Sequence, residues 1–156
     1  MKIETQTSAD LTHIAGMIED TSIAMLTTID ADGDLASRQM APLEMDASGA
    51  LWFFTDLQSS KACQLDIVNL TFTDSARASY VSLSGSSEID NDRARIKRLW
   101  TPLAKSWFPA GPDCATLALL KFVPNVADYW DAPNSRMVRA FGMVASAMTA
   151  KTRGNG

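Results

Sequence analysis

The chain has 156 residues, with 14 lysines and arginines against 18 aspartates and glutamates and a formal net charge of −4. This length suits one domain, and 46% hydrophobic with 21% charged residues argues against bulk disorder. No apolar run approaches the roughly 18 residues of a membrane-spanning helix, and the first residues lack the apolar stretch of a secretory signal. We therefore expect a soluble, cytoplasmic, single-domain protein over residues 1–156, frayed at 151–156.

The first part of the chain predicts a short helix and then a series of strands. Ser8 can cap a helix whose apolar residues recur at helical spacing up to Ile18. Polar turns at 30–34 and 46–49 each contain a glycine and separate segments rich in strand formers. The strands expected along the chain cover residues 22–29, 35–41, 51–55, 68–73, 78–85, 115–123 and 126–130.

Short helices are expected between and after these strands. Four helices are expected after residue 55. The first is capped by Ser59 or Ser60 and ends near Asp66, and the second is capped by Asp90. The third has its first turn near Pro102, and the fourth covers residues 138–150. The segment 51–55 is bulky on both faces, which is typical of a central strand. Seven or so strands with a hairpin near the start and peripheral helices suggest a mainly β protein, a closed or partly open antiparallel barrel.

Few residues could ligate a metal or act as a nucleophile. Cys63 and Cys114 are far apart and match no metal-binding spacing, so we expect two buried, reduced thiols. His13 is the only histidine and lies beside an apolar helical stripe, where a surface or boundary position is expected. These observations argue against a zinc site and against a Ser-His-Asp triad. The reactive group of any reaction would then be a bound cofactor.

Charge is distributed unevenly along the chain. Residues 1–92 carry 15 acids and 4 bases, whereas residues 93–156 carry 3 acids and 10 bases. A solvent-exposed basic helix face explains the excess of bases in the second half more simply than a surface that binds nucleic acid. Between Lys2 and Arg77 the only lysine or arginine residues are Arg38 and Lys61. An anion site built by the first half would therefore have to use these two.

Two segments carry those cations. In Ser37-Arg38-Gln39-Met40, strand alternation places Arg38 and Met40 on one face, and a buried arginine would need an anion. An exposed arginine on an outer face is the alternative. Residues 55–61 run into the start of a helix and carry two serine hydroxyls and Lys61, which together could bind a phosphate group. The glycines and the residue order of a Walker phosphate-binding loop are absent. An ordinary serine cap beside an exposed lysine is the alternative.

A third segment is aromatic. Residues 100–109 hold two tryptophans and a phenylalanine close to Lys105 and Pro109. Such a segment can stack on a planar ligand, fill a subunit interface or pack at the edge of the core.

These motifs, taken in order, resemble those of a known family. Their sequences are Trp52-Phe-Phe-Thr55, Ser59-x-Lys61, Leu99-Trp-x-Pro102, Lys105-x-Trp107-Phe-Pro109 and Tyr129-Trp-Asp131-x-Pro133. The pattern is similar to the general stress protein branch of the pyridoxamine 5′-phosphate oxidase-like, FMN-binding split-barrel proteins, from about Thr7 to Lys151. The resemblance implies a six-stranded antiparallel split β-barrel and a homodimer. It also implies FMN, with FAD as the other option, at the subunit interface.

The resemblance also implies a set of cofactor-binding residues. They are Arg38, Gln39, Met40, Phe53, Phe54, Thr55, Ser59, Ser60, Lys61, Lys105 and Trp107. The Arg-x-Met and Phe-Phe-Thr strands would flank the flavin ring, Ser-x-Lys would bind the phosphate, and Lys-x-Trp would approach from the partner subunit.

This chain departs from the family pattern at several points. The helix after Lys61 is shorter, and Gln39 replaces a common proline. The basic substrate residues of true pyridoxamine phosphate oxidases have no clear counterpart, so we do not expect that activity.

Three functions therefore stay open. The first is a flavin-binding stress protein with low-specificity oxidoreductase activity, and the second is a flavin-dependent reductase or oxidase of a small planar substrate. The third is a barrel without cofactor that serves as an interaction module. A nucleic-acid, membrane or metal partner is not expected, because the strands lack a basic aromatic platform, an apolar span and a ligand cluster.

Overall fold

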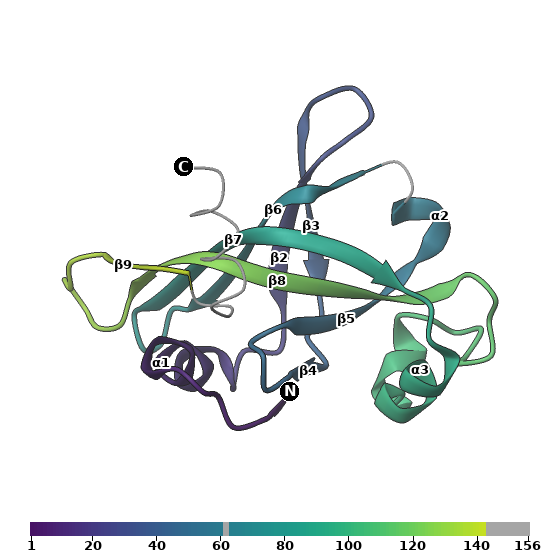
Figure 1. Ribbon diagram of the computed structural model, residues 1–156, viewed down its shortest axis with the longest axis horizontal. Helices are drawn as coiled ribbons and strands as arrows, with labels where there is room; N and C mark the ends of the chain where they lie inside the picture. The colour runs from purple at the N-terminus through teal and green to yellow at the C-terminus, as the bar shows by residue number, and fades with distance from the viewer. Residues whose placement is uncertain (61–62, 143–156) are drawn as a thin grey trace, which may run out of the picture.

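The computed structural model describes residues 1–60 and 63–142, and its long strands run along the whole molecule (Figure 1). The strands are β1 (Lys2–Ile3), β2 (Ala24–Ile29), β3 (Leu35–Met40), β4 (Glu44–Met45), β5 (Leu51–Asp56), β6 (Gln64–Asp74), β7 (Ser79–Asp90), β8 (Leu117–Trp130) and β9 (Val138–Phe141). The helices are α1 (Ala9–Ile18), α2 (Leu57–Ser60), α3 (Arg93–Leu99) and the 3₁₀ helix η1 (Pro102–Ser106). Within the described ranges, none of the helices is long and apolar enough to cross a membrane.

A single curved sheet holds the strands in the order β1-β4-β5-β8-β7-β6-β2-β3, with β9 added beside β8. The pairs are antiparallel except for β1 with β4. The prediction of a mainly β split barrel with peripheral helices is confirmed, but the described residues form nine strands rather than six or seven. Six strands of six or more residues form the body. The three others, β1, β4 and β9, are only 2, 2 and 4 residues long.

Two hydrophobic cores lie on opposite faces of β5. The larger contains the apolar face of α1, which packs against side chains of β2, β5, β6, β7 and β8. The smaller joins Trp52 and Phe54 of β5 to Ile96 of α3 and Ala104 of η1. Figure 1 shows α1 and α3 near opposite ends of the long axis. The β5 strand, buried along residues 51–55 as predicted, separates the two cores because its successive side chains point to opposite faces.

Several local predictions are confirmed. Ser8 Oγ accepts a hydrogen bond from the backbone N–H of Leu11 at 3.0 Å and begins α1. The predicted hairpin is β2 with β3, and Pro102 lies in the first turn of η1. His13 is a boundary residue, with 46% of its side chain exposed and its Nε2 3.3 Å from Asp131 Oδ2. Both cysteines are free thiols, although each is half-buried rather than buried.

Two predicted helix starts are wrong because a nearby aspartate takes the capping role. Asp56 Oδ1 accepts from the N–H of Gln58 at 2.7 Å, so α2 begins before Ser59 and ends at Ser60, and β6 begins already at Gln64. Likewise Asp92, not Asp90, caps α3. Asp90 is the last residue of β7 and forms an ion pair with Arg95 of α3 at 3.0 Å.

Two predictions in the last part of the chain also need correction. Residues 115–130 were expected to form two strands, but Leu117–Trp130 is one strand, because Pro124 and Asn125 are accommodated where the pairing with β7 shifts register. Residues 138–141 form β9 beside β8 instead of a helix, where Arg139 pairs with Asp128 at 2.6 Å. The remainder of the predicted helix, 143–150, and the tail 151–156 lie outside the described residues.

Candidate functional site

A cavity of about 400 Å³ lies between the end of β3, strand β5 and the segment that contains η1. Four of the predicted site residues line it: Gln39, Met40, Phe54 and Trp107. They come from three separate segments of the chain, and the sheet order leaves β3 and β5 unpaired with each other. The cavity therefore occupies the split between two parts of the barrel.

Strand alternation decides which side chains reach this cavity. Met40 is 7% exposed, whereas its neighbour Gln39 is exposed at the cavity rim. In β5, Phe54 contacts the ring of Trp100 at 5.5 Å and that of Phe108 at 6.1 Å between centroids. Phe53 points to the opposite side and is fully buried in the larger core. A ligand in the cavity could thus contact the side chain of Phe54 but only the backbone of Phe53.

A polar corner lies where β5 meets α2. The hydroxyls of Thr55 and Ser60 are 2.7 Å apart, and both residues are 4% exposed. Ser59 is exposed, and its hydroxyl donates to the carbonyl oxygen of Asp56 at 3.0 Å. Lys61, which the sequence places next, lies outside the described residues. The corner therefore presents serine hydroxyls at the end of α2.

Arg38 reaches this corner from β3. Its side chain is half-buried, and its Nη2 donates a hydrogen bond to Cys63 Sγ in the turn after α2. Cys63 N–H in turn donates to the carbonyl oxygen of Ser60 at 3.2 Å. Among the described residues Arg38 forms no ion pair with a carboxylate. The structure thus brings Arg38 into contact with Cys63, just after the segment 55–61, and gives its positive charge no carboxylate partner within the described residues.

One part of the predicted phosphate site differs from the structure. The sequence suggested that free N–H groups at the start of the helix would bind an anion. Asp56 Oδ1 already accepts from the N–H groups of Gln58 and Ser59, at 2.7 and 3.4 Å, and its own negative charge occupies that end of α2. These two N–H groups are therefore already occupied by the side chain of Asp56.

Lys105 and Trp107 have different positions relative to the cavity. Trp107 is 40% exposed and lies between this cavity and a smaller one of about 200 Å³. The smaller cavity also includes Cys114 and Thr116, and a hydrogen bond from the Thr116 hydroxyl lowers the pKa of the Cys114 thiol. Lys105 is exposed on η1 and lines neither cavity within this chain.

Some lining residues were not predicted. The N-terminal residues Met1 and Lys2 form part of the larger cavity because β1 pairs with β4, a non-local contact without a sequence signal. Among the described residues that line this cavity, Lys2 carries the only charged side chain. Within residues 1–60 and 63–142, the side chains that line this cavity include no carboxylate, histidine or tyrosine.

The sequence model of the family described as pyridoxamine 5′-phosphate oxidase like matches residues 9–154, so the chain belongs to this family. This confirms the resemblance drawn from the motifs. A curated relative, protein bli-3 of Neurospora crassa, is 29% identical over 103 residues, which cover 63% of this chain. The matched region covers 49% of that relative, so the chain spans about half of its length.

Solved structures of similar fold include several general stress proteins. A Clostridium acetobutylicum protein related to general stress protein 26 has a TM-score of 0.70 at 23% identity, over 84% of this chain and 93% of the other. The general stress FMN/FAD binding protein of Xanthomonas citri has a TM-score of 0.67 at 26% identity. The match covers 84% of this chain and 95% of the other. These similarities confirm the split-barrel fold class.

Proposed function

We propose that the protein binds FMN, with the flavin ring in the 400 Å³ cavity and the phosphate beside Arg38 and Ser60. The observation that carries this proposal is the half-buried guanidinium of Arg38, which has no carboxylate partner in the described part of the chain. It donates to Cys63, three residues after the buried Ser60 whose hydroxyl contacts that of Thr55. A desolvated cation of this kind is stabilised by an anionic ligand. Flavin binding by the Xanthomonas citri protein of the same fold supports the choice of ligand.

The chemistry of the cavity fits both ends of this ligand. Phe54, Trp107 and Phe108 provide the aromatic and apolar walls that a planar ring system requires. Arg38 and Met40 lie on the same face of β3, two residues or about 7 Å apart. The apolar part of the site and its cationic end are therefore adjacent along one strand, and Lys61 would add a second cation.

A bound flavin would supply hydride and electron transfer that the side chains cannot. The residues of the chain would hold the phosphate, exclude water from the ring and present backbone groups of β3 and β5 to its polar edge. Because the described side chains of the lining include no carboxylate, histidine or tyrosine, the flavin would supply the reactive group. We therefore propose a low-specificity flavin oxidoreductase, for which NAD(P)H-dependent bleaching of the bound flavin is the test.

We further propose that the flavin-bound form is a homodimer with the cofactor at the subunit interface. Leu103 and Trp107, at the rim of the cavity, are 76% and 40% exposed. Exposed apolar side chains at a cavity mouth are typical of a surface that another chain covers. Lys105 lies between them and would contact the flavin of the partner. Light scattering should give a dimer, and Leu103→Glu should shift it toward monomer.

Titration of the purified protein with FMN and with riboflavin tests the ligand proposal. The variant Arg38→Met keeps the length and apolar stem of the side chain but removes its charge. A charge-assisted hydrogen bond contributes about 1.5–3 kcal/mol, so we expect FMN binding to weaken about 10- to 150-fold. Riboflavin has no phosphate, and its binding should change little.

Arg77→Met is the matched control. Arg77 is 61% exposed in the turn between β6 and β7 and pairs only with aspartates among the described residues. This control should bind FMN like the unmodified protein. Equal FMN affinity in the two arginine variants would contradict the phosphate site at Arg38. No flavin uptake by the unmodified protein would contradict flavin binding itself and favour the cofactor-free interaction module.

A further inference from the structure

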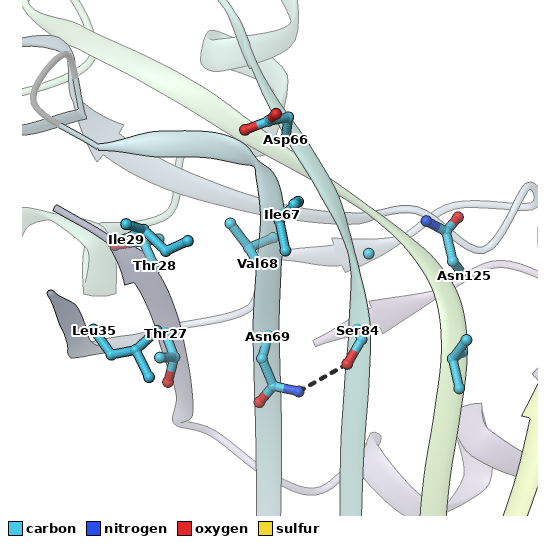
Figure 2. A pocket seen from close by; sticks show the side chains of 12 residues that line it. Thr27, Thr28, Ile29, Leu35, Asp66, Ile67, Val68, Asn69, Ser84 and Asn125 are labelled. Atoms are coloured by element: carbon cyan, nitrogen blue, oxygen red, sulfur yellow. Dashed lines mark hydrogen bonds between the residues drawn. The ribbon is translucent and has the colours of Figure 1, made fainter. Parts of the chain in front are cut away.

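Polar side chains of neighbouring strands hydrogen-bond to one another at several places on the sheet. Figure 2 shows one such contact, in which the amide of Asn69 in β6 donates to the hydroxyl of Ser84 in β7 at 3.1 Å. Glu44 of β4 is different. It is 2% exposed, and its Oε1 accepts no hydrogen bond from the described residues. An ionised carboxylate in such a place is costly, so burial favours the protonated form.

Cations near Glu44 come from β1 and α3. In the sheet, Glu44 is in register with Lys2 of β1 on one side and with Trp52 of β5 on the other. Arg98 Nη2 of α3 lies 3.7 Å from Glu44 Oε2, which is too long for a hydrogen bond. Arg98 therefore attracts a negative charge on Glu44 without donating a hydrogen bond to it. Three further charged side chains lie against the indole of Trp52: Arg95, Lys121 and Asp46.

A second carboxyl group, that of Glu4, adjoins Glu44 from the segment that follows β1. Burial raises the pKa of Glu44, the hydrogen-bonding contact with Glu4 raises it further, and Arg98 and Lys2 offset only part of this rise. Two ionised carboxylates can only accept hydrogen bonds, whereas one shared proton turns one of them into a donor. The folded pair therefore keeps one proton above the pH at which an isolated glutamate loses it.

This pair lies where the N-terminal strand is fastened to the sheet. The N–H of Lys2 donates to the carbonyl oxygen of Leu43 at 3.2 Å, and the N–H of Glu4 donates to that of Met45 at 2.9 Å. Strand β1 is only two residues long and lies at the end of the sheet order, next to β4. Because Met1 and Lys2 line the 400 Å³ cavity, a change in this short pairing would move one wall of that cavity.

We propose that Glu4 and Glu44 form a pH-dependent latch between β1 and β4. While the pair keeps one proton, the O–H of one carboxyl group donates to the other and holds the N-terminal strand in place. When both groups are ionised, two negative charges repel each other at a position that is shielded from water. The strand then separates from β4 and takes Met1 and Lys2 away from the cavity. This proposal does not depend on flavin binding.

Amide hydrogen exchange of the full chain, measured by NMR at a series of pH values, tests the latch. Each rate is compared with that of an unstructured peptide at the same pH, so the resulting protection reports only the opening equilibrium. The reporter is the N–H of Glu4, which bonds across the β1 side of β4. The control in the same sample is the N–H of Leu43, which donates to the carbonyl oxygen of Trp52 at 2.9 Å on the β5 side.

The expected change follows from proton linkage. Between the ordinary glutamate pKa of 4.5 and the higher pKa of the folded pair, the closed segment binds more protons than the open one. Protection of the Glu4 amide should therefore fall as the pH rises above 4.5, by about tenfold for each unit by which the pair's pKa is raised. Protection of the Leu43 amide should stay constant. No fall at Glu4 overturns the proposal, and so does an equal fall at Leu43, because the sheet itself would then be opening.

A pair of matched variants tests whether the two carboxyl groups are responsible. Glu4→Gln removes a titrating group but keeps a donor, because the amide can bond to Glu44 at every pH. Its protection at position 4 should no longer depend on pH. Glu88→Gln makes the same change at a glutamate that is 67% exposed and paired with Lys121, and it should retain the pH dependence. The Leu43 amide verifies that both variants are folded, and equal pH profiles from the two would contradict the latch.

Discussion

The hydroxyl pair of Thr55 and Ser60 joins the end of β5 to the last residue of α2, at the polar corner of the proposed site. The two oxygens are 2.7 Å apart and both residues are 4% exposed. Thr55→Val keeps the shape of the side chain and removes its hydroxyl. The Ser60 hydroxyl is then left buried without this partner, and Ser60→Ala has the reciprocal effect on Thr55.

The structure allows the size of the effect to be worked out. Each single variant leaves one buried polar group unsatisfied, so each should lower the free energy of unfolding by about 1–3 kcal/mol. The double variant removes both hydroxyls and should cost no more than about 1 kcal/mol. For a domain of this length, 1 kcal/mol corresponds to a change in Tm of roughly 2–4 °C. The two single losses sum to about 2–6 kcal/mol, so the double-mutant cycle should show a coupling of at least about 1 kcal/mol.

The chain offers a matched control for this cycle. Thr27 and Ser37 also place their hydroxyls 2.7 Å apart, between β2 and β3, but this pair is exposed to water. Thr27→Val, Ser37→Ala and their combination should each change stability by less than about 0.5 kcal/mol. Urea unfolding followed by circular dichroism measures all six variants. Equal coupling energies in the two cycles would refute the reasoning that burial decides the cost.

The remaining predictions concern backbone packing and pH. Gly85→Ala should destabilise by more than about 2 kcal/mol in urea unfolding, because the added Cβ would lie 2.0 Å from the Val123 carbonyl oxygen. In α1, a Cβ added at Gly16 has no atom within 4 Å, so Gly16→Ala should raise the free energy of unfolding by about 0.5–1 kcal/mol. A loss of stability in both alanine variants would contradict this account. Burial raises the pKa of Glu44, so the folded state keeps this proton to higher pH than the unfolded state, and the associated stability should be lost as pH rises through the folded-state pKa. Urea midpoints of Glu44→Gln should lack that loss as the pH rises above the ordinary glutamate value of 4.5, and parallel curves for both proteins would argue against it.

The elements that the sequence predicted well are those with a strong local pattern. The helix that begins at Ser8 combines a capping side chain with four apolar residues at helical spacing, and all four are buried. The β2–β3 hairpin has a glycine in its turn, where Gly33 adopts φ 84°. In such cases neighbouring residues alone determine the periodicity and the turn.

The elements predicted wrongly are those in which two local solutions compete. Asp56 and Asp92 displaced the expected caps because a carboxylate near the actual helix start accepts the free N–H groups. Residues 138–141 have apolar positions that suit a helix, but pairing with β8 and the Arg139–Asp128 ion pair hold them in a strand. Long-range pairing of this kind leaves no trace in a short window of sequence.

For the candidate site, the sequence by itself determined the kinds of groups available: a scarce pair of cations, an aromatic segment and serine hydroxyls after a central strand. Only the tertiary structure decided that Arg38 reaches Cys63, that Phe54 faces the cavity while Phe53 faces the core, and that Met1 and Lys2 form part of one wall. The physical reason is that composition and spacing are properties of the chain alone. A cavity instead depends on which distant strands pair and on which face of each strand is turned inward.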